Sequence, residues 1–161
     1  TGSWKSPLGS TTRHAGRFDE RGVGGVLARY CACIHRLARA GLAHVFTPDV
    51  EIDYFDGAMH VEGLGALVDG PPPAFRSSMH ALAHASITID GDRAHADTYA
   101  VAHLLLDGDG PAGTLTTRGL RYVDELTRTT DGWLISHRRH IPLWQSDQTA
   151  TPPSAPDALR R

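Results

Sequence analysis

From residue 50 onward the chain is dominated by long segments in which apolar and polar residues alternate, and this pattern most strongly limits the possible folds. Alternation with a period of two is typical of β-strands, because successive side chains point to opposite faces of a sheet. Gly- and Asp-rich turn signals at residues 90–92 and 130–132 separate the longest segments. The pattern predicts strands at residues 50–55, 59–62, 80–89, 93–106, 115–128 and 133–141.

The first part of the chain has helical periodicity instead. Apolar residues recur every three or four positions within residues 19–40 and form one stripe, which predicts a helix that ends at Gly41. Short helices are expected at residues 42–46 and 63–69, and the prolines at 71–73 close the second one. The stripe consists of Val23, Leu27, Tyr30, Ile34 and Leu37 or Ala38.

Helices followed by long antiparallel strands predict the α+β class, with a curved, mainly antiparallel sheet packed against the helices. A strongly curved sheet closed by N-terminal helices forms a cone, whose interior is the expected place for a ligand. One domain is expected at residues 19–146, with a flexible arm at 1–18 and a flexible tail at 147–161.

Composition excludes several classes of partner. The formal net charge is −2, with no dense basic surface, so no nucleic acid or anionic membrane partner is expected. The basic run at residues 138–140 is interpreted as surface. No apolar run approaches the roughly 20 residues of a membrane span. Cys31 and Cys33 lie two apart on a predicted helix, which disfavours a disulfide between them and indicates a reducing, cytoplasmic setting.

Ten histidines are the unusual feature of the composition, and some of them are placed together by the predicted strands. In residues 93–106 one face carries small residues and the other carries Tyr99 and His103. The preceding strand carries His80, and a hairpin would bring facing residues within about 5 Å. The pattern predicts that His80 meets His103 and Tyr99. The alternative, that these are ordinary surface or core histidines, stays open.

Other kinds of site have weaker support. Converging histidines can bind zinc or iron, and a His-ligated metal site in the same pocket is kept as an alternative. However, His80 and His84 are four residues apart on a strand, which separates them by about 13 Å. The Gly-x-Ser-x-Gly motif of serine hydrolases is absent, and no Gly-rich phosphate loop follows a strand. We therefore expect no metal and no cofactor.

Several segments in the expected order resemble one known family. The chain is similar, over residues 18–144, to SnoaL-like proteins of the nuclear-transport-factor-2-like superfamily. This resemblance implies the conical NTF2-like, cystatin-like fold, a small hydrophobic substrate and a homodimer. The segments are Arg29-Tyr-Cys-Ala-Cys-Ile-His35, Phe46-Thr-Pro-Asp-Val-Glu-Ile-Asp-Tyr54, Ser78-Met-His80 with His84, Ile87-Thr-Ile-Asp-Gly-Asp92, and residues 133–144.

Two dehydratases of this superfamily imply roles for individual residues. Tyr30, Tyr54 and His80 match positions that bile-acid 7α-dehydratase or scytalone dehydratase uses. His35 and His103 stand where the bile-acid enzyme has aspartates. An aspartate beside a histidine stabilises its protonated form, so this replacement favours neutral imidazoles.

The expected function is that of a cofactor-independent acid/base enzyme: a dehydratase, cyclase or isomerase that acts on a small polyketide-like or polycyclic substrate. His80 would be the general base, with His103 and His35 relaying the proton and the two tyrosines holding the substrate oxygen. The rival from another class is a non-catalytic ligand-binding or dimerisation module on the same fold. Tyr99, Trp144 and Phe75 are the expected substrate-lining residues.

Overall fold

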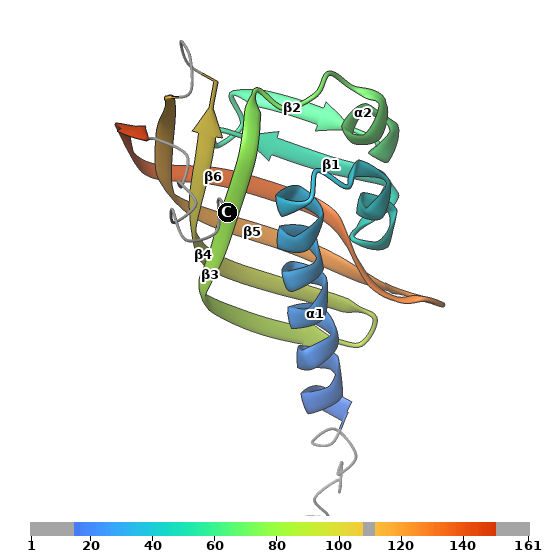
Figure 1. The fold of residues 1–161 in the computed structure, drawn as a ribbon. Coiled ribbons are helices and arrows are strands. Elements are labelled where there is room, and N and C mark those ends of the chain that lie inside the picture. Colours follow the sequence, from blue (N-terminus) through green and yellow to red (C-terminus); the bar gives the residue numbers. More distant parts are fainter. Residues whose placement is uncertain (1–14, 108–111, 151–161) are drawn as a thin grey trace, which may run out of the picture.

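The computed structural model describes residues 15–107 and 112–150 of the chain. They form one curved sheet with a long helix, α1, lying across one of its faces (Figure 1). Most of the expected arm, most of the expected tail and residues 108–111 lie outside the described residues. None of the helices described is both long and apolar enough to cross a membrane.

The sheet has six strands in the order β2-β1-β6-β5-β4-β3. Strands β1 and β6 are parallel, and every other neighbouring pair is antiparallel. The sheet is open, because β2 and β3 are edges, and the expected α+β, mainly antiparallel cone is confirmed. The strands are β1 (Phe46–Tyr54), β2 (Met59–Glu62), β3 (Phe75–Asp90), β4 (Arg93–Leu106), β5 (Gly113–Thr129) and β6 (Gly132–Ala150).

The helices begin and end elsewhere than the sequence pattern predicts. Helix α1 (Ala15–His35) starts within the expected arm and ends before the expected residue 40. Leu37 adopts the left-handed conformation (φ 52°), and the N–H of Ala38 donates back to the carbonyl of Cys33, which closes the helix. A 3₁₀ helix, η1 (Arg39–His44), then replaces the expected helix at 42–46, and α2 (Leu64–Asp69) follows β2. Gly41 does not stop a helix; it leaves room for the Cys33 thiol.

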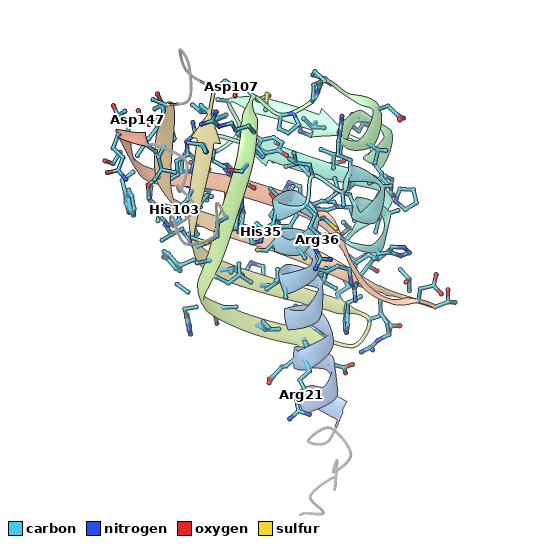
Figure 2. The ribbon with its side chains drawn as sticks, viewed as in Figure 1. Arg21, His35, Arg36, His103, Asp107 and Asp147 are labelled. Carbon is cyan, nitrogen blue, oxygen red and sulfur yellow. The ribbon has the colours of Figure 1, made fainter. Side chains whose placement is uncertain are left out.

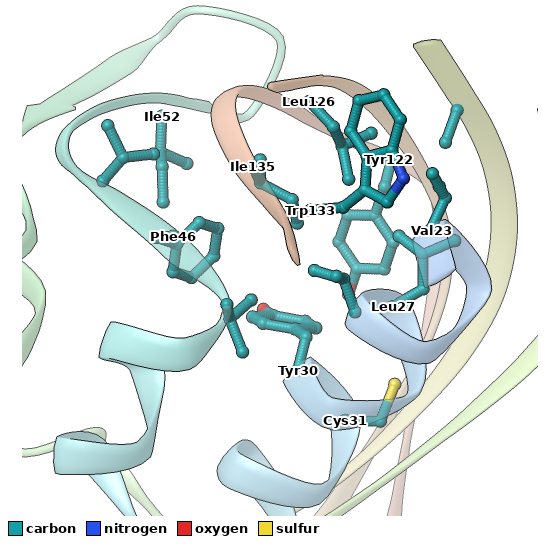
Figure 3. Packing of buried hydrophobic residues seen from close by; sticks show 14 of the residues in the cluster. Val23, Leu27, Tyr30, Cys31, Phe46, Ile52, Tyr122, Leu126, Trp133 and Ile135 are labelled. Atoms are coloured by element: carbon teal, nitrogen blue, oxygen red, sulfur yellow. The ribbon is translucent and has the colours of Figure 1, made fainter. Parts of the chain in front are cut away.

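The hydrophobic core lies between α1 and the sheet face that α1 covers, which we call the inner face. The predicted stripe is confirmed at Val23, Leu27 and Tyr30, which are buried (Figure 3), and Ile34 is partly buried. It is wrong at its end, because Leu37 and Ala38 follow the last residue of α1 and are exposed. Opposite them, the small residues of β4 are the buried ones. Small side chains there leave room for the helix and for large aromatic rings from neighbouring strands. The inner-face residues of β4 are Ala94, Ala96, Thr98, Ala100 and Ala102.

Candidate active site

A row of polar side chains crosses the inner face in register. Thr98 of β4 lies opposite Tyr122 of β5, Tyr122 lies opposite His140 of β6, and His140 lies opposite Tyr54 of β1. Directly opposed residues share a face, so all four side chains point to the same side of the sheet. The rings of His140 and Tyr122 have centroids 5.5 Å apart, and those of His140 and Tyr54 are 5.3 Å apart.

The next row holds a buried ion pair. Arg138 of β6 donates from Nε and Nη2 to the two carboxylate oxygens of Asp124 on β5, at 2.6 and 2.7 Å. The Arg138 guanidinium lies 4.2 Å from the ring centre of Tyr30 and 4.4 Å from that of Tyr122. Figure 3 shows Tyr30 between Tyr122 and Phe46, with edge-to-face contacts to both. The pair is therefore enclosed by aromatic rings, a geometry in which a guanidinium is stabilised by the ring faces.

His80 joins this cluster from the edge strand β3. It lies opposite Ala102 and therefore on the inner face, and its ring centre is 6.3 Å from that of Tyr30. His35, the last residue of α1, stacks on the His80 ring at 5.7 Å. Its Nε2 accepts a hydrogen bond from the backbone N–H of His80, so the end of α1 is fastened to the edge of the sheet beside β3 (Figure 2).

Burial decides the charge of these groups. Burial lowers the pKa of His80 to about 4, and the nearby His35, His140 and Arg138 act in the same direction. Burial and then the positive charge of Arg138 lower the pKa of His140 to about 4. Both imidazoles are therefore neutral at pH 7. Burial also raises the pKa of the Tyr54 and Tyr122 hydroxyls, which remain protonated hydrogen-bond donors.

The ion pair keeps its charges for a different reason. Burial opposes the charge on Arg138, but the Asp124 carboxylate and its hydrogen bonds outweigh this and raise the pKa of Arg138 above its ordinary value. The inner face therefore combines one compensated ion pair with neutral imidazoles and phenols. Such a site can accept a proton on an imidazole and donate hydrogen bonds to an oxygen.

The structure brings Tyr30, Tyr54, His80 and His35 into this cluster, as expected, although Tyr54 contacts His140 rather than His80. The expected meeting of His80 with His103 is wrong. His103 lies opposite Met79, on the face away from α1, and hydrogen-bonds Thr117 there (Figure 2). The register places successive residues on opposite faces, so His80 and His103 cannot face each other.

Two of the three expected lining residues also lie on this outer face. Tyr99 is 43% exposed and sits beside Arg121, which pairs with Asp97. Trp144 is 52% exposed and covers Gly119, where a Cβ would lie 2.2 Å from the indole. Their expected contact with an interior substrate is therefore wrong. Phe75, partly buried at the start of β3, pairs with Leu106, and its lining role stays a prediction.

Tyr122, Asp124, Arg138 and His140 belong to the cluster but were absent from the sequence prediction. The basic run at residues 138–140 was interpreted as surface, yet Arg138 is 1% exposed. A bulge explains the error. Leu126 pairs with Ile135 but Glu125 pairs with His137, so Ser136 is an extra residue in β6 and shifts the alternation by one position. The signal that could have identified β5 is an aspartate at an apolar position of the alternating run 120–126.

Two further features lie outside the cluster. The Asp53 carboxylate accepts hydrogen bonds from His60 (2.8 Å) and His137 (3.0 Å), which tie β2, β1 and β6 together. A groove of about 500 Å³ with both polar and apolar lining lies near the β3–β4 turn and is lined by residues such as Thr88, His95 and Leu126. Within the described ranges no group of three His, Cys, Asp or Glu side chains could hold a metal ion.

Comparison with known proteins shows the family of this chain. Residues 18–139 match the model of the SnoaL-like domain. The chain belongs to the SnoaL-like domain family. An uncharacterized protein of Mycobacterium tuberculosis is 29% identical to it over 131 residues, which cover 74% of this chain and 82% of that protein.

Solved structures show the same fold at lower identity. A candidate scytalone dehydratase from Novosphingobium aromaticivorans has a TM-score of 0.72 and 16% identity, covering 83% of this SnoaL-like chain and 89% of its own. The hexachlorocyclohexane dehydrochlorinase LinA (type 2) has a TM-score of 0.69 and 14% identity, with 88% and 94% covered. Other neighbours with the same fold are described as NTF2-like, at 23% and 14% identity.

Proposed function

We propose that this SnoaL-like protein is a cofactor-independent acid/base enzyme, a dehydratase, cyclase or isomerase. Its substrate would be a small polyketide-like or polycyclic molecule with a C–H bond next to a carbonyl group. The observation that carries the proposal is His80, a mostly buried and neutral imidazole that lies against Tyr30 and near the charge of Arg138. The names of two structural neighbours, a candidate scytalone dehydratase and a dehydrochlorinase, denote eliminations of the same general kind.

In the proposed reaction His80 removes the proton from the carbon next to the carbonyl. The electron pair of the broken C–H bond moves to the carbonyl oxygen, and the enolate accepts hydrogen bonds from Tyr54 and Tyr30. When the carbonyl re-forms, the C–O bond to a β-hydroxyl breaks, and the leaving hydroxide takes the proton from His80 as water. Return of the proton to a different carbon would give isomerisation instead.

The surroundings of His80 restrict the substrate. No carboxylate in the described residues hydrogen-bonds its ring, and His35 contributes an acceptor for its backbone N–H instead. With a pKa held at about 4, the imidazole is free to accept a proton at pH 7 but is a weak base. We therefore expect a substrate whose C–H bond is made more acidic by the adjacent carbonyl group. We also expect the reaction to be favoured because its product is aromatic.

The test substrate is 3-hydroxy-1-tetralone, which yields 1-naphthol when it loses water. Fluorescence measures the 1-naphthol formed, and NMR in D₂O measures the exchange of the α-hydrogens. We expect His80→Ala to lower the rate by about 10²–10⁴-fold. Tyr54→Phe should lower it at least about tenfold, because the oxyanion loses a donor. His84→Ala is the matched control, since His84 is exposed, lies on the same strand and pairs with outer-face Tyr99.

The non-catalytic binding module remains the second candidate, because no carboxylate among the described residues hydrogen-bonds the ring of His80. If His80→Ala and Tyr54→Phe both keep the rate within tenfold of the unsubstituted protein while remaining folded, the catalytic proposal is lost. Ligand binding that survives both substitutions would then favour the binding module.

A further inference from the structure

We propose that Thr98, Tyr122 and His140 form a ligand-binding row, with Nη1 of Arg138 beside it, that binds the carbonyl and hydroxyl oxygens of an uncharged ligand. This proposal rests on the proposed function in one respect, because the ligand would bind on the same inner face of the sheet as the substrate. It assigns recognition to three residues that have no part in the proton transfer.

The first observation is the row itself. Thr98, Tyr122 and His140 are 0%, 1% and 9% exposed and follow one another across three adjacent strands. Neighbouring strands lie about 4.8 Å apart, so the Cβ atoms of the row follow one another at roughly that interval. The row therefore faces one side of the sheet with three polar side chains within the span of a small bicyclic ligand.

The second observation is that Thr98 Oγ1 and His140 Nδ1 have no hydrogen-bond partner within the described residues, and that the Tyr122 hydroxyl has at most one, the hydroxyl of Tyr30. Most buried polar atoms in proteins are hydrogen-bonded. Within residues 15–107 and 112–150, five of the seven buried side-chain atoms without a hydrogen-bond partner belong to the row, to Arg138 and to His80, and the other two are Thr47 Oγ1 and Trp133 Nε1. The five are Thr98 Oγ1, Tyr122 OH, His140 Nδ1, Arg138 Nη1 and His80 Nδ1.

Packing alone gives no reason for these residue types. Thr98 is the only polar residue among the inner-face positions 94–102 of β4, where its neighbours Ala96 and Ala100 are apolar. Valine has the shape of threonine without the hydroxyl, and phenylalanine has that of tyrosine. Burying a hydroxyl without a partner is unfavourable, so the apolar analogues would stabilise the sheet as well or better. The Thr98 hydroxyl, and the hydrogen-bonding capacity of Tyr122 beyond its contact with Tyr30, therefore point to a ligand.

The charges of the interior indicate the class of ligand. The positive charge of Arg138 is compensated by Asp124, and burial keeps His80 and His140 neutral. Arg118 also acts on His140, but it donates a hydrogen bond to Gln145 and its charge acts on the Asp147 carboxylate. A fully charged carboxylate would therefore lose its hydration for little counter-charge. Arg138 Nη1 is a donor only, and hydroxyl groups both donate and accept. An uncharged molecule with carbonyl or hydroxyl oxygens satisfies these groups best.

The row ends near the surface. The ring of Phe55, which is 45% exposed, lies 6.0 Å from that of His140. Phe55 has a left-handed backbone (φ 53°), which is rare for a bulky residue and is found at ligand clamps. We expect ligand to enter beside Phe55 or past the partly exposed His80.

The test is equilibrium binding of 1,3-dihydroxynaphthalene, measured by ligand-observed NMR, with 1-naphthoate as the charged probe and naphthalene as the apolar one. Thr98→Val and Tyr122→Phe should each weaken binding of the diol about tenfold, the loss of one buried hydrogen bond. The melting temperature should stay equal or rise. Thr98→Ser keeps the hydroxyl and should keep the affinity.

The matched controls are Thr88→Val and Tyr99→Phe, which make the same changes on the outer face and should leave binding unchanged. The proposal is overturned if the unsubstituted protein does not bind the diol, or binds 1-naphthoate more tightly. It is also overturned if Thr98→Val and Tyr122→Phe keep the affinity within twofold. Because binding is measured without turnover, failure of the row leaves the His80 test standing, and failure of the His80 test leaves the row standing.

Discussion

Replacement of Asp124 with alanine is expected to lower the free energy of unfolding by about 3–5 kcal/mol, since it leaves the buried charge of Arg138 without a partner. Both side chains are almost fully buried, at 0% and 2% exposure. The two bonds to Asp124 account for Nε and Nη2, and Nη1 already has no partner within the described residues. Loss of the carboxylate would leave the whole guanidinium unsatisfied between the rings of Tyr30 and Tyr122.

The chain offers a matched control for this experiment. Asp97 and Arg121 form a second paired carboxylate and guanidinium on the outer face, where their side chains are 25% and 38% exposed. Solvent screens that pair, so Asp97→Ala should change the free energy of unfolding by about 0–1 kcal/mol. Urea unfolding of both variants measures the difference.

A double substitution separates the charge from the packing. Asp124→Leu with Arg138→Met removes both charges and keeps apolar volume, so it should recover most of the stability lost in Asp124→Ala. If Asp124→Ala and Asp97→Ala differ by less than about 1 kcal/mol, the interior around Arg138 is better hydrated than its burial indicates. The enclosed ion pair would then be the wrong description of this site.

Stability should also fall as the pH is lowered from about 6.5 toward 4. His80 and His140 each have a folded-state pKa of about 4, below the ordinary value of 6.5. Between these values the unfolded chain binds protons that the folded protein does not, so protons favour unfolding in this window. Above pH 6.5 both states are neutral at these residues and the effect vanishes.

The size of the effect follows from the shift. One pKa unit corresponds to about 1.4 kcal/mol, which gives up to about 3 kcal/mol for His140 and less for the more exposed His80. Urea unfolding at pH 7.5, 6.0 and 5.0 measures this loss. His140→Phe should make the pH dependence shallower, whereas His95→Ala, an outer-face change on β4, should not.

Other groups act differently in this range. Hydrogen bonds from His60 and His137 lower the pKa of Asp53, so protonation of that carboxylate reduces stability only below pH 4. The hydrogen bond between His60 and Asp53 raises the pKa of His60, so protonation of His60 favours folding as the pH falls. This contribution to the free energy of unfolding is small, because the His60 side chain is exposed. A stability that stays flat from pH 7.5 to 5 in the unsubstituted protein would contradict the assignment of two neutral buried histidines.

Local periodicity was enough to predict much of this molecule. Residues 93–106 were predicted as a strand and form β4 with the same ends, and the helical stripe through Val23, Leu27 and Tyr30 is buried as expected. These features depend on the backbone repeat and on burial of one face, both of which are written into a short stretch of sequence. The family resemblance further led to Tyr30, Tyr54 and His80, which the structure places on the inner face.

Which face lies inside was decided only by the tertiary structure. Alternation defines two faces of β4 but does not say which one receives α1, and the face with the small residues does so because the helix and aromatic rings need the room. His103 and Tyr99 consequently point outward. The bulge at Ser136 depends on the pairing of β6 with β5, and it turns Arg138 and His140 inward. The sequence by itself therefore determined the elements and part of the site. Strand register and helix docking decided which charged and polar groups complete it.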